Sequence, residues 1–146
     1  MTRYKHWEQK MFDLNIEKLK DSKIYIFGAG QRGMELYYFF RINGYSVSGF
    51  VDNDIKKKGE LVDGILCNTI DCIKDRKNSI VFIANAKYSE NIRKQLEALG
   101  YVNVYMDIDI YDKIQFNNHK NMDQIIELYI DLLYDVFLKN EGRTKS

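Results

Sequence analysis

The sequence predicts an α/β protein, a small doubly wound parallel sheet of about five strands with an added N-terminal helix and a long C-terminal helix. Short apolar runs alternate with stretches of helical periodicity along most of the chain. The run "SIVFIA" (79–84) is continuously apolar, as a strand buried on both faces is. Strands separated by helices imply parallel pairing through right-handed crossovers.

Each element follows from its local pattern. Residues 5–20 carry apolar side chains at roughly helical spacing between charges, which predicts an amphipathic helix packed on the main body. Gly44 and Gly100 each follow a helical stretch and stop it. The sequence predicts strands at 23–27, 46–51, 64–68, 79–84 and 102–107, and further helices at 31–43, 69–74, 86–99 and 121–139.

The 146 residues suffice for one ordinary domain. We divide the chain into a leading helix (1–21), a sheet-containing domain (22–116), and a C-terminal helix with a frayed tail (117–146), and expect these to form one globular unit.

Composition excludes several classes of function. The formal net charge is +1, which gives no electrostatic reason to bind nucleic acid or an anionic membrane. No apolar run approaches the roughly 18 residues of a membrane span, and the charged N-terminus does not resemble a secretion signal. We therefore expect a cytoplasmic protein. Cys67 and Cys72 lack metal-site or redox-pair spacing and are interpreted as free thiols, and no metal site is expected.

Three glycines between the first predicted strand and the following helix form a motif. Residues 28–33, "GAGQRG", follow the pattern G-x-G-x-x-G. In dinucleotide-binding proteins the first glycine permits a tight turn, the second lets a pyrophosphate approach the backbone, and the third lets the helix pack on the strand. Amides at the helix start then face the phosphate.

A carboxylate follows at the expected distance. Asp52 ends the second predicted strand, 19 residues beyond Gly33, where an acidic side chain can accept hydrogen bonds from ribose hydroxyls. These observations favour a nucleotide ligand. The alternative is structural: the glycines serve packing alone and Asp52 caps the following turn.

Residues 23–105 resemble a known group of proteins. The glycine turn, the strand end "FVDND" and the later "KKKGELVDGI" are similar to the Rossmann-like N-terminal domain of bacterial nucleotide-sugar acyltransferases of the bacillosamine and sialic-acid type. They also resemble the N-terminal domain of polysaccharide-synthesis dehydratases and epimerases, and distantly CoA-binding domains. The acyltransferases continue into a hexapeptide-repeat β-helix that this sequence lacks, so the resemblance implies ligand binding rather than acyl transfer.

The resemblance also implies a set of binding residues. It places phosphates over the start of the motif and a nucleoside near the second strand end, with the ligand a UDP-sugar or NAD(P). Lys56–Lys58 are either a solvated loop, which we favour, or a phosphate contact. The expected binding residues are Gly28, Ala29, Gly30, Gln31, Arg32, Gly33, Asp52, Asn53 and Asn85.

Catalytic residues are not evident from the sequence. No Tyr-x-x-x-Lys pair, Ser-His-Asp set or metal set is found. We therefore expect a nucleotide- or nucleotide-sugar-binding module in bacterial surface-polysaccharide synthesis, without its own catalysis and serving a partner glycan-synthesis enzyme. Two alternatives stay open: an NAD(P)-dependent oxidoreductase or epimerase of nucleotide sugars, and a dinucleotide-sensing regulatory domain.

The C-terminal stretch Asn121–Lys139 predicts an interaction surface. Its apolar residues recur at steps of three and four and form one stripe along about five helical turns. A monomer would expose this stripe, so the sequence predicts a homodimer in which this helix pairs with its mate or with the partner's leading helix.

Overall fold

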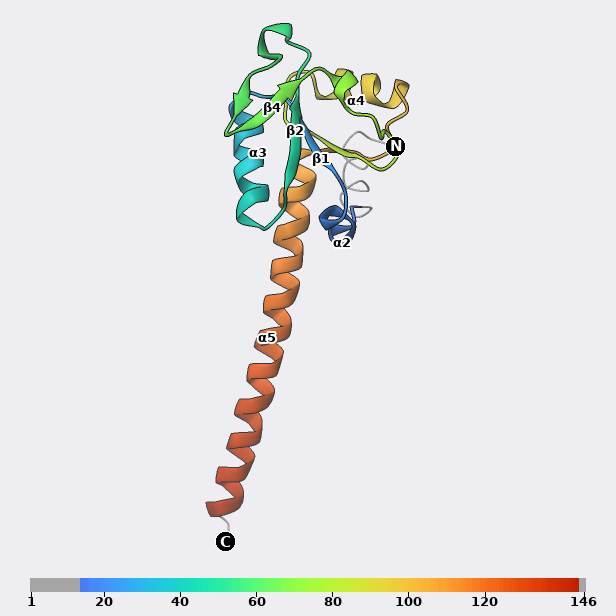
Figure 1. Cartoon of the computed structure of the whole chain (residues 1–146). Coiled ribbons are helices and arrows are strands. Elements are labelled where there is room, and N and C mark those ends of the chain that lie inside the picture. Colours follow the sequence, from blue (N-terminus) through green and yellow to red (C-terminus); the bar gives the residue numbers. More distant parts are fainter. Residues whose placement is uncertain (1–13, 145–146) are drawn as a thin grey trace. The chain divides into compact units, whose positions relative to one another are not determined.

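The computed structural model describes residues 14–144 (Figure 1). The chain divides into two compact units, with the boundary between Ile110 and Tyr111. The first unit contains the sheet and the helices that cover it, and the second is helical throughout its described residues.

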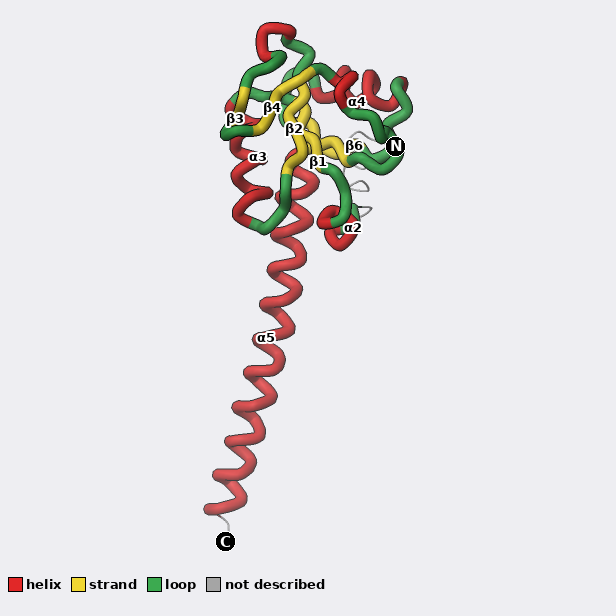
Figure 2. The backbone as a smooth tube through the Cα atoms, viewed as in Figure 1, coloured by secondary structure: helices red, strands yellow, loops and turns green. Residues whose placement is uncertain are grey.

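The first unit is built on a mostly parallel sheet. Within residues 14–144 it has six strands in the order β3-β4-β2-β1-β5-β6, and only β3 runs antiparallel to its neighbour. Figure 2 shows β3, β4, β2 and β1 following one another across the sheet. This confirms the predicted fold class. The strands are β1 (Ile24–Phe27), β2 (Val47–Val51), β3 (Leu61–Val62), β4 (Ile65–Asn68), β5 (Ile80–Ile83) and β6 (Val104–Met106).

Alternate residues of the central strands are buried on opposite faces of the sheet. On one face, the rings of α3 (Gln31–Ile42) pack on the sheet, with Phe40 against Phe82 and Tyr37 against Phe50. On the other, Phe27, Val81 and Ile83 join Ile92 and Leu96 of α4 (Ser89–Ala98) in one apolar cluster. Burial on both faces explains why β5 reads as a continuous apolar run.

Helix α2 (Ile16–Lys20) and two 3₁₀ turns are the shorter helical elements. Helix α2 begins at Asn15, whose side-chain oxygen accepts hydrogen bonds from the amides of Glu17 and Lys18. Helix α2 covers the end of the helix predicted over residues 5–20, but residues 14 and 15 are not helical, because Asn15 is extended and caps α2. Residues 5–13 of that prediction lie outside the described part. Two 3₁₀ turns, η1 (Ile55–Lys57) and η2 (Ile70–Cys72), lie in the loops after β2 and β4.

Several elements differ from the sequence prediction. Residues 69–74 form only the 3₁₀ turn η2, and α4 begins at Ser89 rather than at residue 86. Strand β3 was not predicted, because a two-residue strand is too short to show a period. These errors do not change the fold class, because each concerns a short segment beside a correctly located strand.

The C-terminal helix α5 (Asp107–Thr144) begins 14 residues before the predicted start at Asn121. The Asp109 carboxylate accepts a hydrogen bond from the Met106 amide at 2.7 Å and so stabilises the first turn directly after β6. The predicted start at Asn121 follows two asparagines, residues 117–118, but asparagine costs a helix interior well under 1 kcal/mol, about 0.7 at most, and does not stop it. In the described part of the chain, no helix combines the length and the apolar character needed to cross a membrane.

Candidate functional site

The candidate site lies at the carboxyl edge of the sheet. Chain connections leave the central strand β1 in one direction toward β2, and the later strands β5 and β6 extend in the other. The loops after the neighbouring strands β1 and β5 therefore diverge from each other. Ligands of open α/β sheets bind at such a position. The glycine motif follows β1, Asp52 follows β2, and Asn85 lies in the loop after β5.

Two of the motif glycines are required by packing. Gly28 has φ +122°, and a Cβ there would lie 2.7 Å from the backbone oxygen of Ala84. A Cβ on Gly33 would lie 1.8 Å from the backbone oxygen of Gly28, closer than any real contact. These glycines let the β1 loop approach β5 and let α3 pack on that loop. The structural alternative, in which the glycines serve packing alone, accounts for Gly28 and Gly33.

Gly30 is different. Its backbone is extended, with φ −91° and ψ −162°, a conformation open to any residue. A Cβ there would meet only the Lys57 ammonium nitrogen, at 3.8 Å. Neither strain nor crowding within the described residues demands glycine here, so packing leaves the middle glycine of the motif unexplained.

The Asp52 carboxylate binds the glycine turn and its own loop at once. Its Oδ2 accepts a hydrogen bond from the Ala29 amide at 3.0 Å, and its Oδ1 accepts one from the Asp54 amide at 2.9 Å. The second bond caps the turn after β2, as the structural alternative expects of Asp52. The Lys57 ammonium lies 3.7 Å from Oδ2. The carboxylate is thus held at the base of the site, with its side chain 18% exposed.

A cleft of about 340 Å³ opens beside Asp52. It brings together four of the nine residues expected from the sequence, Gly28, Asp52, Asn53 and Asn85. The remaining five, residues 29–33, do not line it. The walls are completed by Phe27 and by four residues at and within the start of α4: Tyr88, Asn91, Ile92 and Gln95.

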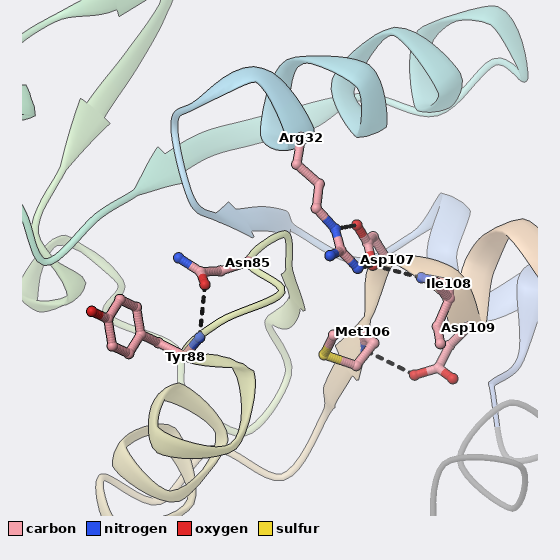
Figure 3. Close-up of polar contacts among 7 residues, drawn as sticks. All are labelled: Arg32, Asn85, Tyr88, Met106, Asp107, Ile108 and Asp109. Carbon is pink, nitrogen blue, oxygen red and sulfur yellow. Dashed lines mark hydrogen bonds and ion pairs between the residues drawn. The ribbon is translucent and has the colours of Figure 1, made fainter. Parts of the chain in front are cut away.

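The polar groups of the cleft are mostly side-chain amides. Asn53 and Gln95 bind each other reciprocally, with Asn53 Nδ2 donating to Gln95 Oε1 at 2.9 Å and Gln95 Nε2 donating to Asn53 Oδ1 at 3.1 Å. Asn85 Oδ1 accepts from the Tyr88 amide at 2.9 Å (Figure 3). Amides offer a donor and an acceptor without charge, which suits a base or a sugar.

The sequence prediction missed Tyr88, Asn91 and Gln95. Their spacing of three and four places them on one face of a helix that follows β5 directly, and this was a signal available in the sequence. The prediction stopped at Asn85 because the boundary between loop and helix could not be set there.

Arg32 lies away from the cleft lining. Its Nη2 donates a hydrogen bond to Asp107 Oδ1 at 2.6 Å, and its Nε donates one to Asp107 Oδ2 (Figure 3). The guanidinium therefore binds the carboxylate through two hydrogen bonds. Asp107 is buried. Gln31 donates its side-chain amide to Glu35 on the next turn of α3, at 3.4 Å.

Cys67 lies in β4, close to Asp52 and Glu60. Its side chain is buried, and burial raises the pKa of the thiol, with the negative charges of Asp52 and Glu60 adding to the effect. A raised pKa keeps the sulfur protonated at neutral pH, so it is a poor nucleophile. Within residues 14–144, no group of three or more His, Cys, Asp or Glu side chains is arranged to hold a metal ion.

Comparison with protein families gives a match over most of this unit. Residues 20–105 match the family described as C2185-like, N-terminal. The chain belongs to this C2185-like family. The matched segment runs from the end of α2 to β6 and contains all nine binding residues expected from the sequence.

A solved structure is similar to part of the chain. No curated protein matches the chain. A crystal structure of UDP-D-quinovosamine 4-dehydrogenase from Vibrio fischeri is similar with a TM-score of 0.46 and 22% sequence identity. The alignment covers 58% of this chain and 76% of the dehydrogenase chain.

Proposed function

We propose that this protein binds a nucleotide or nucleotide sugar in the cleft at the carboxyl edge of its sheet, as an accessory or sensing module without its own catalysis. The observation that carries this proposal is Gly30. Packing requires glycine at the two outer positions of the motif and leaves the middle one free of contacts except for the Lys57 ammonium. A phosphate approaching the backbone is the reason why a nucleotide-binding turn has glycine there.

The chemistry of the cleft supports a nucleoside beside that phosphate position. Its volume of about 340 Å³ is that of a small-ligand site. The amides of Asn53, Asn85, Asn91 and Gln95 provide neutral donors and acceptors for a base, and the half-exposed Tyr88 ring provides a surface for stacking. Asp52 is the acceptor for a ribose hydroxyl, because a carboxylate has further lone pairs after its two amide bonds.

The resemblance to nucleotide-sugar enzymes supports a UDP-sugar as the ligand and surface-polysaccharide synthesis as the setting, with a glycan-synthesis enzyme as the partner. NAD(P) is the ligand of the two alternatives, the oxidoreductase and the regulatory domain. The lack of catalytic activity is part of the proposal, and the raised pKa of Cys67 supports it by excluding that thiol as a nucleophile.

Calorimetry tests the proposal directly. Wild-type protein is titrated with UDP, UDP-N-acetylglucosamine, NAD⁺, NADH and coenzyme A. We expect a UDP compound to bind with a dissociation constant well below 1 mM. Gly30→Ala and Gly30→Val form a graded pair: both fold, and the larger side chain abolishes binding by filling the phosphate position. Failure of every ligand to bind below millimolar concentration would show that the glycines are structural.

We also propose that α5 mediates self-association. Its side chains between Met122 and Leu138 include twelve large apolar ones, each 47–65% exposed in the isolated chain. Polar residues Asp123, Glu127, Asp131 and Asp135 form one acidic row at four-residue intervals. An apolar surface of this extent is covered by another protein chain in solution, and a second copy of α5 is the occupant that we propose.

A further inference from the structure

The loop after β2 carries three consecutive lysines, and only one of them faces the site. The 3₁₀ turn η1 is fixed by Asp54, whose side chain accepts a hydrogen bond from the Lys56 amide at 3.0 Å. The amides of Lys57 and Lys58 bond back to Asp54 and Ile55 within the same turn. Lys56 and Lys58 are exposed, whereas the Lys57 side chain is 32% exposed and is directed toward Asp52.

The Lys57 ammonium lies beside the middle glycine. Its nitrogen is 3.8 Å from the point where a Gly30 Cβ would sit and 3.7 Å from Asp52 Oδ2. The second distance is about 1 Å longer than that of a tight charge-assisted hydrogen bond, typically 2.7–2.9 Å. The ammonium is thus held near the carboxylate without being engaged tightly by it, and it borders the open space over Gly30.

A phosphate at this position needs a cation. Asp52 places a negative charge at the base of the site, and a phosphate oxygen approaching Gly30 would be repelled by it. Arg32, one of the binding residues expected from the sequence, has its guanidinium bound to Asp107 by two bonds. Lys57 offsets the charge of Asp52 and has ammonium protons to donate.

We propose that Lys57 is the cation that binds the phosphate groups of the ligand at Gly30, while Asp52 binds the ribose. This inference rests on the proposed nucleotide-binding function and names the residue that distinguishes a nucleotide from a nucleoside. The ammonium moves from its loose contact with Asp52 to a phosphate oxygen, and the carboxylate becomes available to the ribose hydroxyls.

The test compares UDP with uridine. Both are titrated by calorimetry into wild-type protein, Lys57→Gln, and the matched controls Lys56→Gln and Lys58→Gln, which remove the same charge from the same loop. Loss of one charge-assisted hydrogen bond weakens UDP binding by about 10- to 100-fold in Lys57→Gln, with uridine binding unchanged. The two controls change UDP binding by no more than about threefold, the scale of a weak surface charge effect. Lys57→Arg retains most of the UDP affinity.

Each other outcome has a distinct meaning. Equal weakening of UDP in all three glutamine variants would overturn the assignment, since it would reflect the net charge of the loop. Parallel loss of UDP and uridine in Lys57→Gln would also overturn it, because the lysine would then support the nucleoside. Wild-type protein that binds uridine as tightly as UDP would refute a phosphate site and leave the nucleoside site standing. Wild-type protein that binds neither would refute the proposed function as well.

Discussion

Arg32 and Asp107 form an ion pair with two parallel bonds between the first turn of α3 and the first residue of α5. The Asp107 side chain is 2% exposed and the Arg32 side chain 35%. The pair ties the helix that follows the glycine turn to the end of β6. The pair stabilises the carboxyl edge of the sheet, because both partners belong to segments that flank the candidate site.

Removing one partner of this pair should destabilise the fold. Arg32→Met leaves the buried Asp107 carboxylate without its cation and should lower the free energy of unfolding by about 2–3 kcal/mol. Arg32→Lys keeps the charge but loses the two-bond geometry, so its cost is smaller. Urea denaturation measures both variants.

The Arg41–Asp63 bridge provides the control for this prediction. Its side chains are 65% and 37% exposed, so Arg41→Met should cost less than about 1 kcal/mol. Equal costs for Arg32→Met and Arg41→Met would contradict the structural role of the Arg32–Asp107 pair.

The glycines of the motif should separate into two classes by stability. Gly28→Ala and Gly33→Ala force a Cβ against backbone oxygens and should each cost on the order of 3 kcal/mol. Gly30→Ala meets no such contact and should stay within about 0.5 kcal/mol of wild type. Thermal and urea unfolding of the three variants give the comparison. A Gly30→Ala variant as unstable as the other two would assign all three glycines to packing.

The two cysteines should differ in their reaction with a thiol reagent. Desolvation raises the pKa of both thiols, so they differ in access: Cys67 is buried and Cys72 is exposed. At pH 8, Ellman's reagent should titrate one thiol in the folded protein and two in urea. Cys72→Ser should abolish the fast reaction, whereas Cys67→Ser should leave it. Rapid labelling of both thiols in folded protein would contradict the burial of β4.

The Cys67 thiol should also give the protein an alkaline limit. Since its pKa is raised above the ordinary value of 9.0 in the folded state, its contribution to stability is complete below that pH. The contribution is lost as pH rises toward the folded-state pKa. The free energy of unfolding should therefore fall as the pH rises past 9.0, and the fall should be smaller in Cys67→Val. An identical pH profile for both proteins would refute this contribution.

Charges on α5 should disrupt self-association. Leu132→Glu together with Val136→Glu puts two carboxylates into the apolar surface, and light scattering should then report a monomer of 17.3 kDa. Wild-type protein should have at least twice that mass. Asp131→Gln with Asp135→Gln changes the charge by the same amount in the opposite direction, within the acidic row, and should leave the assembly intact. A wild-type protein that is monomeric at high micromolar concentration would refute the proposed role of α5.

Periodicity and glycine positions predicted most strands of the sheet. Features that depend on a particular tertiary contact were not predicted. Strand β5 was placed because burial on both faces gives a continuous apolar run, and β1, β2, β4 and β6 were placed as short apolar stretches that alternate with the predicted helices and turns. The predicted start of α5 was wrong, because the observed start depends on the hydrogen bond between the Asp109 carboxylate and the Met106 amide after β6. The pairing of Arg32 with Asp107 joins residues 75 positions apart and no local pattern records it. Lys57 could not be separated from its two neighbours for the same reason.

The unpredicted strand β3 has a consequence for the behaviour of the sheet. The amide and carbonyl of Cys67 point away from β2, and they bond to the Glu60 oxygen and the Gly59 amide, each at 2.8 Å. Without this short hairpin, β4 would present open hydrogen-bonding groups to any extended chain that came near. Strand β3 itself is only two residues long, so it offers few open backbone hydrogen-bonding groups to a further strand. Growth of the sheet into an edge-to-edge fibril is thereby blocked on this side.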